Sequence, residues 1–228
     1  MKVAYIFHGH SRTWKQCYEN FFNNVYAVAP GDIFIHTWDR VNPIVGAPWN
    51  GWGYLTGEAL KAASTTPDIS GIFEAYKPKV LMVEQDRLPD LSRYKDSNEI
   101  PSIAPGCFGV KLMLESSRKA FEAMKSYGTY DRVFSTRLDL NYTSKLNINE
   151  VQSDRLVGAR KGGAFDIWMM GTTEQMDIKT QYFNHVDAYW YNRDINMHYE
   201  DTLLEYLRDN NLRDFIASDI SYTTPRIF

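Results

Sequence analysis

The sequence is poor in cysteine and has no excess of positive charge, and each shortage excludes a class of protein. Its two cysteines, Cys17 and Cys107, are far apart and belong to no Cys-x-x-Cys or cysteine and histidine pattern. This spacing argues against a zinc site and a disulfide framework, so we expect reduced thiols, as in the cytoplasm. The formal net charge is −3, which leaves no basic excess for binding the phosphate backbone of a nucleic acid.

Long apolar runs and glycine-rich phosphate motifs are also missing. The apolar run at the N-terminus, Val3 to Phe7, is too short for a signal peptide or a membrane span. We therefore expect a cytoplasmic protein without a transmembrane segment. Peripheral contact with a membrane stays open. Neither the dinucleotide pattern GxGxxG nor the phosphate-loop pattern GxxxxGKS/T occurs.

The sequence does contain enough apolar residues for one α/β domain. Its 228 residues are 44% hydrophobic and show no repeat and no linker. Short apolar runs, typical of strands covered on both faces, alternate with helical patterns. Strands are expected at residues 2–7, 32–38, 79–84, 130–140, 154–159, 165–170 and 215–222, and helices at 14–25, 57–63, 70–76, 108–125, 173–192 and from 198 onward. Long loops are expected at 39–56 and 85–106. Residues 1–228 are thus predicted to form a single domain with a mixed, mostly parallel central sheet flanked by helices.

The segment YDRVFSTRLDL, residues 130–140, ends in a charged pair, Arg137 and Asp139. Residues two apart in a strand share a face, so the guanidinium and the carboxylate are expected side by side. In open α/β sheets, ligands bind just beyond the carboxyl ends of the strands. The pair is therefore either an ordinary ion pair or the ligand-facing end of the sheet.

The first predicted strand opens into the loop HGHSR, residues 8–12, which leads into a helix. Thr13 and Gln16 have the spacing of a capping box. A strand, a glycine-containing loop and a helix N-terminus together can bind an anion, which Arg12 would strengthen, although the segment could also be a plain turn. His36, at the end of the second predicted strand, is either a ligand-facing residue or a satisfied core histidine.

Five segments together resemble the A-type (GT-A) glycosyltransferases, in particular small cytosolic or virus-encoded members: YIFHGHSRTW, DIFIHTWD, YDRVFSTRLDL, DIWMMGT and HYEDTLLEYL. The resemblance implies a Rossmann-like domain and a hexosyltransferase-like activity of the kind used in polysaccharide biosynthesis. Residues 1–140 would bind a nucleoside-diphosphate sugar of the UDP or GDP type. Residues 141–228 would face a glycan or another hydroxyl acceptor.

In this family an Asp-x-Asp element holds a divalent cation on the donor diphosphate. It falls here on residues 137–139, with Arg137 in place of the first aspartate. The resemblance implies Mn²⁺ or Mg²⁺ with Asp139 and His198 as ligands, since such cations prefer hard ligands. Alternatively, Arg137 itself neutralises the diphosphate by bidentate contact, and His198 is a loop histidine without a role.

The remaining site residues are expectations from the same resemblance. The donor would be held by His8, Gly9, Arg12, His36, Arg137 and Lys161. An inverting enzyme also needs a carboxylate base near the acceptor hydroxyl, for which the candidates are Asp201, Glu200 and Asp166. Asp201 and Glu200, the favoured pair, could instead simply complement a helix dipole, and Asp166 could be a surface or capping carboxylate.

Two other functions stay open from the sequence. One is a non-catalytic nucleotide- or carbohydrate-binding protein that kept the fold, which Arg137 in place of an aspartate favours. The other is a different α/β nucleotide enzyme, such as a nucleotidyltransferase or a sulfotransferase. The missing phosphate-loop glycines weigh against this last possibility.

Overall fold

The structure is a computed structural model that describes residues 1–41, 65–87, 104–159, 167–191, 199–213, 216–217, 220 and 222–224. Its strands are β1 (Val3–His8), β2 (Asp32–Trp38), β3 (Val80–Glu84), β4 (Arg132–Arg137), β5 (Asn141–Tyr142), β6 (Val157–Gly158), β7 (Trp168–Gly171), β8 (Ile216–Ala217) and β9 (Tyr222–Thr223). Its helices are α1 (Trp14–Phe21), α3 (Ile69–Tyr76), α4 (Ala104–Lys125), α5 (Thr173–Tyr191) and α6 (Tyr199–Asp209), with a π-helical turn η1 (Phe22–Tyr26) and a 3-10 turn η3 (Ile148–Glu150).

The central sheet is mixed and mostly parallel, as the sequence predicts. Its strand order in the described part of the chain is β3-β2-β1-β4-β7-β6-β8. Strands β1 to β4 run parallel, whereas β7 runs antiparallel to both β4 and β6. The order β3-β2-β1-β4 is that of the first half of doubly wound nucleotide-binding folds, so the architecture is compatible with a Rossmann-like fold.

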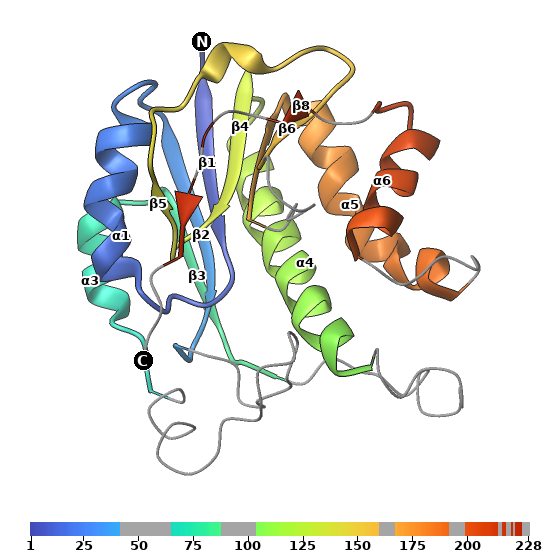
Figure 1. Ribbon diagram of the computed structural model, residues 1–228. Helices are drawn as coiled ribbons and strands as arrows, with labels where there is room; N and C mark the ends of the chain where they lie inside the picture. The colour runs from blue at the N-terminus through green and yellow to red at the C-terminus, as the bar shows by residue number, and fades with distance from the viewer. Residues whose placement is uncertain are drawn as a thin grey trace.

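Helices cover both faces of this sheet (Figure 1). Helices α1 and α3 lie on one face, α4 and α5 lie on the other, and α6 packs on α5. Each face has its own apolar core: Tyr5 and Phe7 of β1 pack toward α1, and Ala4 and Ile6 pack toward α4. Because β1 is buried on both faces, every position along it except the last is apolar.

Several predicted elements are confirmed, and their ends have physical causes. Strand β2 spans the predicted residues 32–38. Helix α4 begins at Ala104 rather than Phe108, because Pro105 falls in the first turn, where proline is tolerated. Gly128 follows its last turn with φ of 105°, the left-handed conformation that glycine adopts readily.

Two local predictions are wrong. Thr13 makes no capping hydrogen bond, because its backbone (φ −108°, ψ 27°) lies outside the extended conformation that a capping side chain needs. The predicted strand at residues 215–222 is two short strands in different sheets, since β8 pairs with β6 and β9 pairs with β5.

Other parts of the prediction fall where the structure gives no description. The predicted helix at 57–63 and most of the loops at 39–56 and 85–106 lie outside the described residues. Among the helices that are described, none is both long enough and apolar enough to cross a membrane.

Candidate functional site

Charged and polar side chains gather where β1, β2 and β4 end. Strand β1 continues through α1 to β2 on one side, whereas β4 adjoins β1 on the other, so the strand order reverses between β1 and β4. Figure 1 shows these strands running toward the lower part of the molecule, and contacts of Gly9 and His36 with Ser116 place the ends of β1 and β2 beside the middle of α4. In doubly wound sheets, the crevice at such a reversal is the usual ligand site.

The centre of this edge is a cluster of Arg12, Arg137 and Asp139, called here the arginine–aspartate cluster. Arg137 donates two hydrogen bonds to Asp139, from Nε to Oδ1 at 2.8 Å and from Nη2 to Oδ2 at 2.6 Å. Nη1 of Arg12 lies 3.7 Å from Oδ2 of the same carboxylate. Burial alone would raise the pKa of Asp139, which is 4% exposed, but Arg137 and Arg12 lower it below its ordinary value.

The local sequence explains how Asp139 comes to face the arginines. Leu138 and Leu140 are each 1% exposed and pack into the core on the α1 side of the sheet. Asp139 lies between them, in the turn that follows β4. The two buried leucines therefore anchor the turn in which the carboxylate meets Arg137.

His8, the last residue of β1, lies next to Arg137 in the sheet register. Its side chain is 2% exposed, and its Nδ1 atom has no hydrogen-bond partner among the described residues. The pKa of His8 lies well below its usual range, first because burial penalises the charged ring and then because Lys179 and Arg137 repel a proton. His8 is therefore a neutral ring at the carboxyl end of β1, and its Nδ1 atom has no partner within the described residues.

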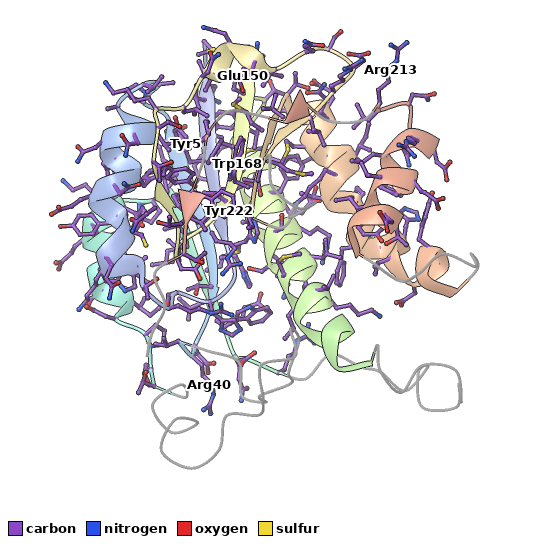
Figure 2. All side chains as sticks on the ribbon, viewed as in Figure 1. Tyr5, Arg40, Glu150, Trp168, Arg213 and Tyr222 are labelled. Carbon is purple, nitrogen blue, oxygen red and sulfur yellow. The ribbon has the colours of Figure 1, made fainter. Side chains whose placement is uncertain are left out.

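His10 sits in the loop that follows β1. Its Nδ1 atom lies 3.2 Å from the carbonyl oxygen of Arg40, a residue that Figure 2 shows at the same end of the molecule. Burial and the nearby charge of Arg12 lower the pKa of His10 to about 4. This ring is also neutral at physiological pH.

Ser116 of α4 joins the β1 loop to β2. Its Oγ accepts a hydrogen bond from the N–H of Gly9 at 2.7 Å and lies 2.8 Å from Nδ1 of His36. Nε2 of His36 in turn lies 3.5 Å from a carboxylate oxygen of Glu84. A serine, a histidine and an acid in a row occur in hydrolases, but Ser116 is fully buried and already accepts from Gly9, so it serves as a support for the loop.

We expect His36 to make the protein less stable in mild acid. Burial, partly opposed by Glu84, lowers the pKa of His36 from 6.5 to about 4, so below pH 6.5 the unfolded chain binds a proton that the folded chain does not. The contribution of the neutral His36 ring to the free energy of unfolding is fully present above pH 6.5. It falls as the pH drops toward 4, and at pH 5 it is smaller by about 2 kcal/mol. Urea unfolding at pH 7 and pH 5 should show a smaller loss for His36→Gln than for the wild type.

The matched control for this prediction is His185→Gln, because His185 is exposed on α5. The difference between the two variants isolates the effect of burying the imidazole at position 36. Equal losses for His36→Gln and the wild type would contradict the prediction.

The sequence analysis missed a second buried polar contact on the α4 side of the sheet. Lys179 of α5 is 2% exposed and donates to Oγ of Ser117 at 2.9 Å. A signal was present, since Lys179 is spaced three residues after Met176 and seven before Val186, both buried. That spacing puts the lysine on the inward stripe of the helix.

The structure brings part of the predicted site together. One set of predicted residues lies at the shared edge of β1, β2 and β4: His8, Gly9, Arg12, His36, Arg137 and Asp139. Asp201 is exposed on α6, a helix that packs on α5. Lys161, Asp166 and His198, and the side chain of Glu200, lie outside the described residues. The roles assigned to these acids and to Lys161 and His198 stay predictions.

The described residues do not by themselves fit a divalent cation. Within the described ranges, no three His, Cys, Asp or Glu side chains come together as a metal site. Asp139, the predicted ligand, directs both of its oxygens at guanidinium groups. The metal role of Asp139 therefore stays a prediction.

A surface pocket lies at the other end of the sheet from these charges. It is lined by residues of η1 and α3 and by the start of β2, including Tyr26, Asp32 and Tyr76. Because open α/β sheets bind ligands at the carboxyl ends of their strands, this pocket is not the candidate functional site.

Comparisons with known proteins add no family to this picture. The sequence matches no protein-family model and no curated protein. What supports a function is therefore the set of side chains at the carboxyl edge of the sheet.

Proposed function

We propose that this protein is a glycosyltransferase that moves a sugar from a nucleoside-diphosphate donor to a hydroxyl acceptor. The observation that carries the proposal is the pair of guanidiniums, Arg12 and Arg137, at the point where the strand order reverses. A diphosphate leaving group needs positive charge there, and arginine matches phosphate geometry well. The order β3-β2-β1-β4 supports nucleotide binding at the same place.

In the proposed reaction, the oxygen of the acceptor hydroxyl bonds to the anomeric carbon of the sugar. The bond between that carbon and the diphosphate oxygen breaks, and its electron pair leaves with the diphosphate. The hydroxyl proton passes to a carboxylate, for which Asp201, Glu200 and Asp166 are the candidates in an inverting enzyme. Arg12 and Arg137 would stabilise the charge on the leaving group.

A second candidate function is a nucleotide- or carbohydrate-binding protein without catalysis. The bidentate pair between Arg137 and Asp139 favours it, because the carboxylate that would bind a metal in the family is already paired. The two candidates differ in turnover and share ligand binding.

The experiment is a thermal-shift and calorimetry panel of UDP-, GDP-, CMP- and dTDP-sugars, each with Mn²⁺ and with EDTA, followed by assays of donor hydrolysis and transfer. We expect one nucleotide class to raise the Tm by about 5 °C or more at a concentration of about 100 Kd, and to be turned over. Binding without turnover across an acceptor library would favour the second candidate. No binding to any nucleotide would exclude both.

A further inference from the structure

The arginine–aspartate cluster contains more positive than negative charge at a buried position. Arg12 and Arg137 both face Asp139, and the side chains are 26%, 15% and 5% exposed, respectively. Asp139 accepts two hydrogen bonds from Arg137, and both donors, Nε and Nη2, lie on one edge of the guanidinium. Asp139 therefore contacts both arginines and helps to orient them.

A divalent cation is a poor occupant of this arrangement. To coordinate Asp139, it would have to break the bidentate pair with Arg137 and approach two guanidinium charges. Repulsion between like charges is strong where water is largely excluded, and here the carboxylate is 4% exposed. The separated Arg137 would also lose its charge-assisted hydrogen bonds.

An anion meets the opposite conditions. Within the arginine–aspartate cluster two guanidiniums face one carboxylate, and Arg137 and Lys179 both act electrostatically on His8. His8 supplies an independent observation, since its buried Nδ1 has no partner among the described residues and its backbone neighbour in the sheet is Arg137. A neutral imidazole can offer an N–H to a phosphate oxygen at this edge.

We propose that Asp139 is the internal counter-ion of a two-arginine phosphate site, which binds the diphosphate of a nucleoside-diphosphate donor without a divalent cation. Asp139 orients Arg12 and Arg137 and keeps them from repelling each other before the ligand arrives. The inference rests on the proposed function for its ligand class, although the charge arrangement itself does not require turnover.

The test uses inorganic pyrophosphate as the probe, with binding measured by calorimetry in EDTA. We expect the wild type to bind it. Asp139→Asn removes the competing negative charge, while its amide oxygen can still accept a hydrogen bond from Arg137 and keep that arginine in place. This variant should bind pyrophosphate about fourfold more tightly. Arg12→Met should bind about tenfold more weakly, since it loses a charged contact to phosphate.

Lys15→Met is the matched control for Arg12→Met. Lys15 lies on the first turn of α1, is 65% exposed and pairs with Asp68 away from the cluster. Its loss should leave pyrophosphate binding unchanged within about twofold, since an exposed charge is screened by salt. Thermal melts establish that each variant is folded.

Several results would overturn the inference: no pyrophosphate binding in EDTA, or weaker binding by Asp139→Asn together with loss of Mn²⁺ binding detected by electron paramagnetic resonance. The two proposals fail separately. Metal-free pyrophosphate binding without any sugar transfer keeps the phosphate site and removes the glycosyltransferase. Transfer that requires Mn²⁺ and is lost in Asp139→Asn does the reverse.

Discussion

Arg137→Met should destabilise the protein by about 3 kcal/mol, because it leaves a buried carboxylate without its bidentate partner. Asp139 is 4% exposed, and the nearest positive charge left within the described residues would be Arg12, at 3.7 Å. The double variant Arg137→Met with Asp139→Asn should recover most of the loss, because the uncompensated charge is gone. Urea unfolding followed by circular dichroism measures both variants.

The matched control is Arg132→Met on the same strand. Within the described residues, Arg132 donates hydrogen bonds to the carbonyl oxygens of Asp131 and Ile148 and pairs with no carboxylate, so its loss should cost about 1 kcal/mol or less. If Arg137→Met costs no more than this control, or if Asp139→Asn does not rescue it, then Arg137 and Asp139 are not a buried pair in solution.

Phe134→Ala should cost about 3–5 kcal/mol by opening a cavity in the core behind the site. Phe134 is fully buried in β4, where its ring stacks on Trp168 at 5.3 Å and lies 6.0 Å from Tyr5 and from Tyr142. Figure 2 shows Tyr5 and Trp168, two of these rings, within the body of the molecule. Chemical unfolding of the purified variant measures the loss.

Phe73→Ala provides the comparison, because Phe73 of α3 is 54% exposed. The same deletion there should change stability by about 0.5 kcal/mol or less. A cost at Phe134 similar to the cost at Phe73 would show that the rings around Phe134 do not form a fixed core.

The strands and the strand-end charges could be predicted from the sequence, because burial on both faces demands continuous apolar runs. Strand β1 follows this rule, whereas β4 also buries two polar residues, Ser135 and Thr136. The charged residues Arg137 and Asp139 occur at the end of β4 and just after it. The sequence predicts that Arg137 and Asp139 meet on one face of a strand. The two residues do meet, but β4 ends at Arg137 and the pair forms across the turn that follows.

The polar contacts between elements could not be predicted in this way. Gly9, His36 and Ser116 meet through the packing of α4 on β1 and β2, and a serine on a helix carries no sign of its partner. Nor does periodicity show that β7 runs antiparallel between β4 and β6. The two short strands after residue 215 were merged in the prediction because their partners, β6 and β5, are set by tertiary structure.

The position of β1 also governs how the chain can assemble during synthesis. One edge of β1 pairs with β2, which follows soon after it, whereas the other pairs with β4, which begins only at Arg132. Because the ribosome adds about 5–20 residues per second, β4 is synthesised on the order of ten seconds after β2. For that interval an apolar strand has an open edge, which is the kind of surface that recruits other chains. A nascent chain that ends before β4 is therefore the form of this protein that most needs a chaperone.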